Sequence, residues 1–243
     1  MCGIFGSNSF EKFRTLYKLN QSRGDFAYGM LGLAREGDDL LVKGPGLADT
    51  TKLFTTEEYT YFRHEPIPPP SKFTYFLGHT QAPTSGVREF NEETTHPFQL
   101  GRWCVAHNGV LSNTKELQKK YMLRESKVDT EVIASMLDYT EIKTGNPEKD
   151  DLRALKKTFD ELRGTFGCWV YNIETKNTYL IRVGSTLNGD PNSGDFTSAM
   201  DPGKKYKPLT EGVIYQIGLS DGKTRDGIMD IGHFDHNSPY FIL

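Results

Sequence analysis

The chain has 243 residues, with 29 Lys and Arg against 32 Asp and Glu, and 36% of its residues are hydrophobic. This length fits one large domain or two small ones that can bury a sizeable core. The net charge of −3 argues against a protein that coats nucleic acid, and no apolar run approaches the roughly 18 residues of a membrane span. Three widely spaced cysteines, Cys2, Cys104 and Cys168, indicate neither a disulfide framework nor a metal site, and they favour a reducing cytoplasm.

Apolar residues at helical spacing predict four helices. The first spans residues 9–20 behind Ser9, a candidate N-cap. The second is short, runs through 117–122 and begins at Asn113 or Thr114. The third starts near Asp129, and the fourth carries its apolar face at positions 152, 155, 159 and 162.

Short β-rich runs lie around these helices, at residues 2–5, 73–77, 103–106, 168–173, 179–183 and 213–217. The strands outnumber the helices and occur in consecutive groups, so the order is not a strict β-α-β alternation. A layered α+β fold is therefore expected rather than a doubly wound parallel sheet.

The first residues, Met1-Cys2-Gly3-Ile4-Phe5-Gly6, are the most informative segment. An initiator methionine before a small residue is commonly removed, which leaves Cys2 with a free α-amine beside its thiol. The amine titrates near pH ~8 and the thiol near ~8.5, so one residue supplies base and nucleophile close to neutral pH. Retention of Met1 would turn the amine into an amide and abolish this base. The alternative is that Cys2 only packs in a small apolar strand.

Further short motifs follow in a fixed order. They are Arg23-Gly24, Gly78-His79-Thr80, His96-Pro97-Phe98, His107-Asn108-Gly109, Asp129-Thr130-Glu131 and Arg163-Gly164-Thr165-Phe166-Gly167. Together with the N-terminal Cys-Gly-Ile, they resemble the glutaminase domain of the class II glutamine amidotransferases over about residues 2–218. The resemblance implies the N-terminal-nucleophile hydrolase fold, which is a four-layer α/β/β/α sandwich of two mostly antiparallel sheets.

The resemblance also implies a role for several residues. The family hydrolyses the side-chain amide of glutamine, so Cys2 would form a γ-glutamyl thioester while its α-amine moves the proton. Asn108 and the Gly109 N–H would stabilise the oxyanion, Asp129 would bind the substrate amine, and Thr84 would contact the substrate. Taken without the resemblance, Asn108-Gly109 predicts a tight hairpin turn after strand 103–106, and Asp129 predicts a helix N-cap.

The expected partner of the substrate carboxylate departs from the family pattern. The family places an Arg directly after Gly-His-Thr, whereas this chain has Gln81, a neutral amide that cannot replace a guanidinium. Three explanations compete: Arg88 or Arg23 supplies the charge, the substrate lacks that carboxylate, or the domain is largely inactive. Arg23 and Gln81 are retained as candidate substrate-binding residues, although the Asp that usually follows the Arg-Gly pair is displaced by one position.

Other candidate groups are assigned structural roles. His79, His96 and His107 are expected to form hydrogen-bonding scaffold, because the terminal amine already fills the role of the base. Cys104 and Cys168 lie in apolar strands and are expected to be inert. The tail histidines at 233 and 236 lack the spacing of a metal site, and no phosphate-binding loop is present, so neither a metal nor a cofactor is expected.

The sequence predicts a glutaminase-like domain over residues 1–218 and a C-terminal segment, 219–243, that docks a partner or closes a sheet. The expected activity is release of glutamate and ammonia from glutamine, with the ammonia passed to a synthetase on a separate polypeptide. No nucleic acid or membrane partner is expected. Two alternatives stay open: a γ-glutamyl or other amide hydrolase of the same fold, and a non-catalytic binding or regulatory module.

Overall fold

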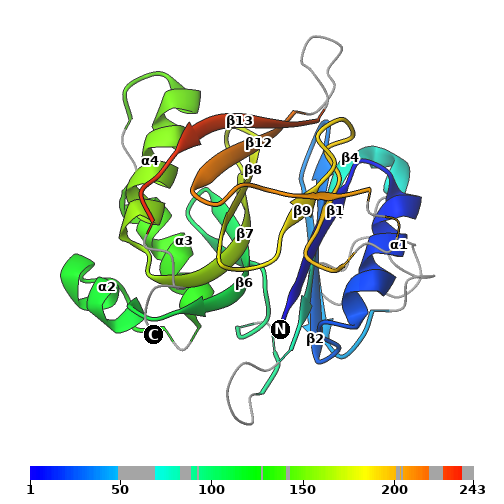
Figure 1. Cartoon of the computed structure of the whole chain (residues 1–243), viewed down its shortest axis with the longest axis horizontal. Helices are drawn as coiled ribbons and strands as arrows, with labels where there is room; N and C mark the ends of the chain where they lie inside the picture. Colours follow the sequence, from blue (N-terminus) through cyan, green and yellow to red (C-terminus); the bar gives the residue numbers. More distant parts are fainter. Residues whose placement is uncertain are drawn as a thin grey trace.

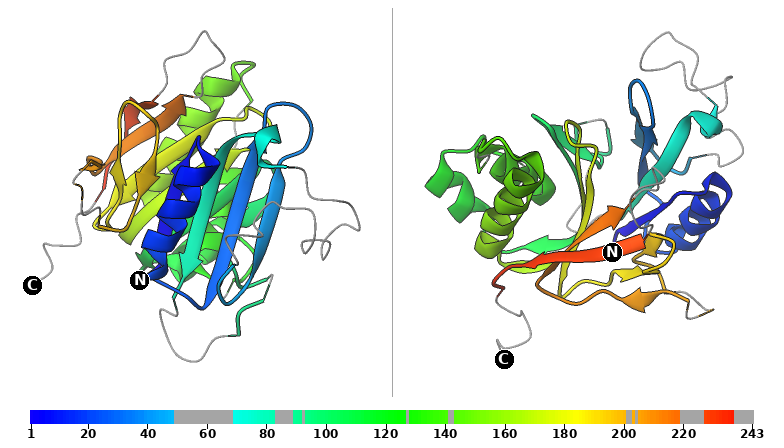
Figure 2. Two further views of the ribbon diagram at one scale, coloured as in Figure 1. Left: turned by 90° about the vertical axis from the view of Figure 1, so that its right-hand side faces the viewer. Right: turned by 90° about the horizontal axis from the view of Figure 1, so that it is seen from above.

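The computed structural model describes residues 1–48, 69–82, 89–91, 93–126, 128–140, 143–200, 203, 205–218 and 227–236. Two antiparallel sheets pack face to face, and helices cover the outer face of each (Figure 1). Helix α1 (Phe10–Gln21) lies on one sheet, as the left view of Figure 2 shows. On the other sheet lie α2 (Thr114–Tyr121), α3 (Asp129–Tyr139) and α4 (Pro147–Glu161). The predicted α/β/β/α sandwich is confirmed.

One sheet has seven strands and carries the N-terminus near its centre. Its order is β11 (Lys207–Pro208), β9 (Asn188–Gly189), β10 (Phe196–Thr197), β1 (Gly3–Ser7), β4 (Phe73–Gln81), β2 (Ala27–Ala34) and β3 (Leu40–Pro45). A 3-10 turn, Pro70–Lys72, leads into β4. The central place of β1 buries all five of its residues. Strands β2 and β3 were not predicted from the sequence, because two glycines interrupt the apolar run of β2.

The second sheet has six strands and receives the late part of the chain. Its order is β13 (Gly227–His233), β12 (Val213–Gly218), β8 (Thr178–Val183), β7 (Gly164–Asn172), β6 (Trp103–Leu111) and β5 (Phe98–Leu100). Strand β13 pairs antiparallel with β12 at the sheet edge. The boundary expected at residue 218 stays a prediction, but part of the segment beyond it belongs to this sheet.

Side-chain alternation along the strands divides the core into three layers. Ile4 of β1 packs between the two sheets, against residues such as Trp169. Its neighbour Phe5 packs on the other face, against Phe13 of α1. The third layer joins β6, β7 and β8 to the helices α3 and α4. Every second residue of a strand therefore points into the space between the sheets.

The helix starts differ in detail from the predicted caps. The hydroxyl of Ser9 accepts a hydrogen bond from the Lys12 N–H, as an N-cap does, and its predicted role is confirmed. Helix α3 begins at Asp129 itself with Val128 at the cap position, so the cap role considered for Asp129 is wrong. Its carboxylate is in the first helical turn, where it is directed to other partners. None of the described helices is long and apolar enough to cross a bilayer.

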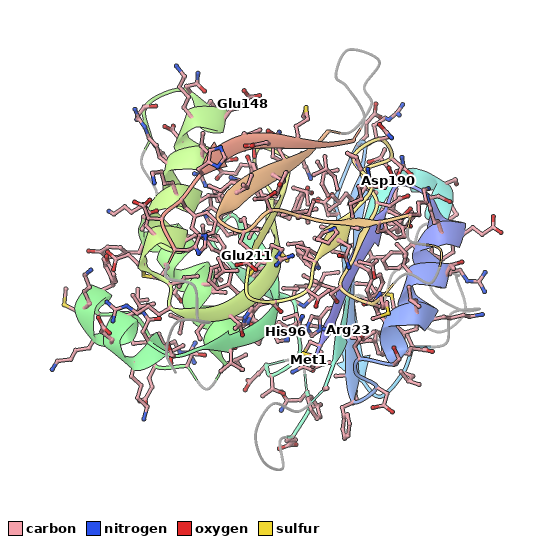
Figure 3. The ribbon with its side chains drawn as sticks, viewed as in Figure 1. Met1, Arg23, His96, Glu148, Asp190 and Glu211 are labelled. Atoms are coloured by element: carbon pink, nitrogen blue, oxygen red, sulfur yellow. The ribbon has the colours of Figure 1, made fainter. Side chains whose placement is uncertain are left out.

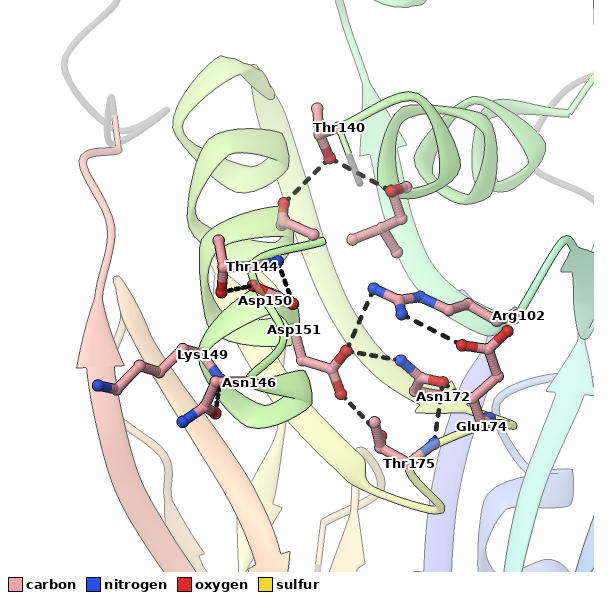
Figure 4. Close-up of polar contacts among 12 residues, drawn as sticks. Arg102, Thr140, Thr144, Asn146, Lys149, Asp150, Asp151, Asn172, Glu174 and Thr175 are labelled. Carbon is pink, nitrogen blue, oxygen red and sulfur yellow. Dashed lines mark hydrogen bonds and ion pairs between the residues drawn. The ribbon is translucent and has the colours of Figure 1, made fainter. Parts of the chain in front are cut away.

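A buried carboxylate fastens α4 to the hairpin between β7 and β8 (Figure 4). Asp151 accepts hydrogen bonds from Asn172 Nδ2 at 2.6 Å, Thr175 Oγ1 at 2.7 Å and the Tyr179 hydroxyl at 2.9 Å. The guanidinium of Arg102 adds an ion pair at 3.5 Å. Burial raises the pKa of Asp151, although these partners act in the opposite direction. So many donors indicate a structural anchor rather than a reactive group.

A close backbone approach ties β2 to the segment that enters β5. A Cβ atom at Gly29 would lie 1.9 Å from the carbonyl oxygen of His96 and 2.8 Å from Cδ of Pro97. No side chain fits there unless residues 96–97 move. The glycine that obscured β2 in the sequence thus lets this segment lie against the sheet.

Gly29→Ala is therefore expected to destabilise the protein by about 1–3 kcal/mol, because the added methyl group overpacks a backbone contact. Thermal denaturation measures the effect. Gly44→Ala on β3 is the matched control, since the atoms nearest to its Cβ would belong to the Tyr28 side chain, 3.3 Å away. Equal melting temperatures for the two variants would contradict this account of the packing.

Candidate functional site

Four polar side chains share the face of the strands that looks into the space between the sheets. Cys2 lies two positions before Ile4 of β1, so the two side chains point to the same face of the sheet. His79 and Gln81 likewise share a face with Leu77 of β4. On the facing sheet, Asn108 points to the same face of β6 as Cys104 and Ala106. The pleat of the two sheets directs all four inward at one end of the sandwich. They are Cys2, His79, Gln81 and Asn108.

Cys2 is nearly buried, with 5% of its surface exposed. Its thiol donates to the carbonyl oxygen of Ala82 at 3.7 Å, and its own carbonyl accepts a hydrogen bond from Arg23 Nε at 2.9 Å. Burial lowers the pKa of Arg23, although Cys2 acts in the opposite direction. Met1 is exposed, and its sulfur lies 3.9 Å from Arg23 Nη2. Figure 3 shows Met1, Arg23 and His96 at the same end of the sandwich.

The backbone behind Cys2 is held by a buried polar cluster that the sequence did not reveal. Ser198 Oγ accepts from the Ile4 N–H at 2.8 Å and donates to Asn20 Oδ1 at 3.2 Å. The Thr80 hydroxyl donates to the Asn20 carbonyl at 2.8 Å, and a Cβ atom at Gly3 would strike that hydroxyl at 2.4 Å. Gly3, directly after Cys2, is thus required by this close contact, which binds β1 to the end of α1.

Asn108 and Gly109 lie inside strand β6, so the predicted hairpin turn is wrong. They pair with Gly167 and Phe166 of β7 in a continuous ladder. Gly109 adopts φ 151°, and a Cβ there would lie 2.0 Å from the Thr165 carbonyl oxygen. The Asn108 side chain donates to Ser185 Oγ at 3.0 Å, and that hydroxyl donates back to the Asn108 carbonyl at 2.8 Å. Ser185, absent from the predicted site, fixes the orientation of this amide.

Gln81 is buried, and its amide holds the segment before β5. Nε2 donates to the Thr94 carbonyl at 3.1 Å, while Oε1 accepts from the His96 backbone N–H at 3.3 Å and lies 3.1 Å from His96 Nδ1. Only 1% of the Gln81 surface is exposed. Gln81, at the position where the family pattern has an Arg, therefore bonds to Thr94 and His96 and does not face solvent in this conformation.

Asp129 lies at the start of α3, with 27% of its side chain exposed. One oxygen accepts from the Leu111 N–H at 3.2 Å, and the other lies 3.5 Å from His107 Nδ1. Burial alone would raise the pKa of Asp129, but His107 and the N–H groups of Leu111 and Thr130 hold it below its ordinary value. The group is therefore a carboxylate at neutral pH that is still partly open to solvent.

The three histidines make hydrogen bonds inside the protein, as expected for scaffold. His79 Nε2 lies 3.3 Å from the His107 carbonyl oxygen. His96 Nε2 lies 2.5 Å from Thr130 Oγ1, and His107 Nδ1 lies 3.3 Å from the same hydroxyl. The Thr130 hydroxyl, for which no role was expected within the Asp129-Thr130-Glu131 motif, thus joins two of the rings.

Thr84 and Arg88 lie outside the described residues. The remaining cysteines are free thiols in the core: burial raises the pKa of Cys104 to about 12 and raises that of Cys168 as well. Their predicted inertness agrees with these shifts. Within the described part of the chain, no group of three or more His, Cys, Asp or Glu residues is placed to hold a metal ion.

Comparison with known sequences matches residues 89–184 to a glutamine amidotransferase domain. The chain is 29% identical over 176 residues to 7-cyano-7-deazaguanine synthase 2 of Sulfurisphaera tokodaii, which covers 68% of this chain and 35% of that protein. It is 27% identical over 242 residues to glutamine–fructose-6-phosphate aminotransferase of Staphylococcus epidermidis. That alignment covers 93% of this chain and 37% of the relative. The chain thus spans about a third of the length of these relatives.

Solved structures share the fold. The glutamine phosphoribosylpyrophosphate amidotransferase of B. subtilis superposes with a TM-score of 0.66 at 19% identity, over 98% of this chain and 50% of that one. A glutamine aminotransferase class-II domain protein from Silicibacter pomeroyi superposes with a TM-score of 0.53 at 12% identity, over 96% and 99%. The fold, the matched domain and these relatives agree with the motifs in the sequence. The chain is thus similar to the class II glutamine amidotransferases in its motifs, in the matched domain over residues 89–184 and in its fold.

Proposed function

We propose that this chain hydrolyses the side-chain amide of glutamine, with Cys2 as the nucleophile after removal of Met1. The observation that carries the proposal is that Cys2 and Asn108 come from facing sheets and are directed into the same space. The hydrogen bond from Arg23 to the Cys2 carbonyl holds the chain end in place. Such preorganisation is what an acyl-transfer site requires.

In the proposed reaction, the α-amine takes the proton of the Cys2 thiol, and the thiolate attacks the amide carbon. Asn108 Nδ2 carries two hydrogens and gives one to Ser185, which leaves the second for the oxyanion beside the Gly109 N–H. The C–N bond then breaks, and the α-ammonium passes its proton to the departing ammonia. Water attacks the thioester, releases glutamate and restores the thiol.

The charged ends of glutamine need partners in such a site. Asp129 is the proposed partner of the substrate amine, because it is a carboxylate that stays partly exposed. Arg23 is the proposed partner of the substrate carboxylate among the described residues, since its outer nitrogen Nη2 lies against the exposed Met1, 3.9 Å from the sulfur. Thr84 remains a proposed substrate contact. Removal of Met1 would then free both the α-amine and the Arg23 guanidinium.

The proposed products are glutamate and ammonia, and the ammonia would be passed to a synthetase. A separate polypeptide for that synthetase, and a cytoplasmic site of action, stay proposals from the sequence. One observation favours a second function, hydrolysis of an amide that lacks the glutamine carboxylate: the Gln81 amide is buried where the family pattern has a guanidinium. Turnover of a panel of γ-glutamyl and simple amides separates the two functions.

Intact mass is expected to show a protein without Met1 that gains one adduct from a γ-diazo-ketone analogue of glutamine. The adduct forms because the analogue places its electrophile where the Cys2 thiolate attacks. Cys2→Ala is expected to lose both the adduct and the glutaminase activity while keeping the fold by circular dichroism. A protein that retains Met1, or an adduct that survives in Cys2→Ala, would overturn the proposal.

Asn108→Ala is expected to lower kcat by about 10²–10³-fold with a small change in KM, because an oxyanion donor acts in the transition state. Steady-state glutaminase kinetics give both constants. The control is Asn113→Ala, which removes another buried amide. Its side-chain partners among the described residues are the Glu161 carbonyl and the Arg163 N–H, so the change should cost stability but not kcat. A change confined to KM in Asn108→Ala would remove this residue from the oxyanion site.

A further inference from the structure

Buried polar side chains join the end of β4 to the start of α3 in an unbroken series. The members of this series, named the histidine chain below, are Gln81, His96, Thr130 and His107. We propose that the histidine chain has one fixed direction and holds Asp129 in place relative to the nucleophile strand. In this proposal Gln81 and Thr130 are positioning residues.

The direction starts at Gln81, whose amide has only one possible orientation. Its Nε2 faces the carbonyl oxygen of Thr94, which can only accept, and its Oε1 faces the backbone N–H of His96, which can only donate. The acceptor that lies 3.1 Å from His96 Nδ1 is therefore an oxygen. It follows that His96 carries a hydrogen on Nδ1.

A neutral His96 with its hydrogen on Nδ1 has a lone pair on Nε2. The Thr130 hydroxyl, 2.5 Å away, must then donate to it. A hydroxyl has one hydrogen, so towards His107 the same oxygen can only accept. His107 Nδ1, 3.3 Å from that oxygen, therefore carries a hydrogen.

The last member, His107, ends against oxygen atoms. Its Nδ1 also lies 3.5 Å from Asp129 Oδ1, and its Nε2 lies 3.4 Å from the carbonyl oxygen of Thr165. The other carboxylate oxygen of Asp129 accepts from the Leu111 N–H. One hydroxyl hydrogen, on Thr130, thus decides which way His107 presents its N–H to the carboxylate.

Packing leaves the histidine chain little room to rearrange. The ring of His79 stacks on His96 with centroids 4.1 Å apart and planes 22° apart. His96 and Thr130 are both buried, at 4% and 0% exposed. At the β4 end, Gln81 directly precedes Ala82, whose carbonyl oxygen accepts from the Cys2 thiol. The histidine chain therefore connects the strand beside the nucleophile with the carboxylate proposed for the substrate amine.

The kinetic consequence rests on the proposed glutaminase function. Thr130→Val keeps the shape of the side chain but removes the hydroxyl, so His107 is no longer oriented and Asp129 is released. We expect the KM for glutamine to rise about tenfold with kcat changed less, since a misplaced charge pair weakens substrate binding. Thr130→Ser restores a hydroxyl and is expected to restore the KM.

The test combines these kinetics with NMR of the protein carrying ¹³C,¹⁵N-labelled histidine. The wild-type protein is expected to show the Nδ1–H form of His96, and Thr130→Val to shift the His96 and His107 ring signals. Thr158→Val is the matched control, because Thr158 is an equally buried helical threonine that bonds Thr140 Oγ1 at 3.0 Å, away from the histidines. It should change neither the ring signals nor the KM.

An Nε2–H form of His96, or ring signals and KM unchanged in Thr130→Val, would overturn the proposal. The ring signals are read without substrate, so they test the direction of the histidine chain even in a protein that lacks glutaminase activity. Lack of activity in the wild type together with the expected His96 form would overturn the proposed function and leave the histidine chain standing.

Discussion

The alternation of side chains along β1 is the constraint on which the site depends. Because β1 is paired on both sides, by β4 and β10, its register cannot slip, and a shift by one residue would exchange Cys2 with Gly3. Cys2 would then face Asn20 of α1, where a Cβ atom has no room. The same close packing that forbids this error directs the thiol towards Asn108 on the opposite sheet.

The two sheets contribute unequal parts of the site. The seven-stranded sheet and the turn after α1 contribute the thiol and Arg23, while the six-stranded sheet and α3 contribute Asn108 and Asp129. Hydrogen bonds cross between the layers, among them those from Trp169 Nε1 to the Gly78 carbonyl at 3.1 Å, from His79 to β6, and from the Tyr171 hydroxyl to Asp39 at 2.6 Å. The relative position of the sheets is therefore set by directional contacts as well as by apolar packing, which alone would tolerate sliding.

Local patterns in the sequence were enough to predict the layered fold and the main helices. They failed where tertiary contacts override a local preference: Asn108-Gly109 has the sequence of a turn, yet the ladder with β7 keeps it extended. Aspartate is favoured at helix N-caps, but the carboxylate of Asp129 instead contacts His107 and accepts a hydrogen bond from a strand N–H. Ser185 lies 77 positions from its partner, so no local signal could associate the two.

The place of β1 in its sheet has a consequence for synthesis. One neighbour of β1 is β10, at Phe196–Thr197, and the Ser198 hydroxyl that holds Ile4 lies 194 positions downstream of it. The ribosome must therefore complete most of the chain before this side of β1 is covered. Until then the first residues have an open edge. The removal of Met1 proposed above would thus have the period of translation in which to occur, before the completed sheet encloses the cysteine beside it.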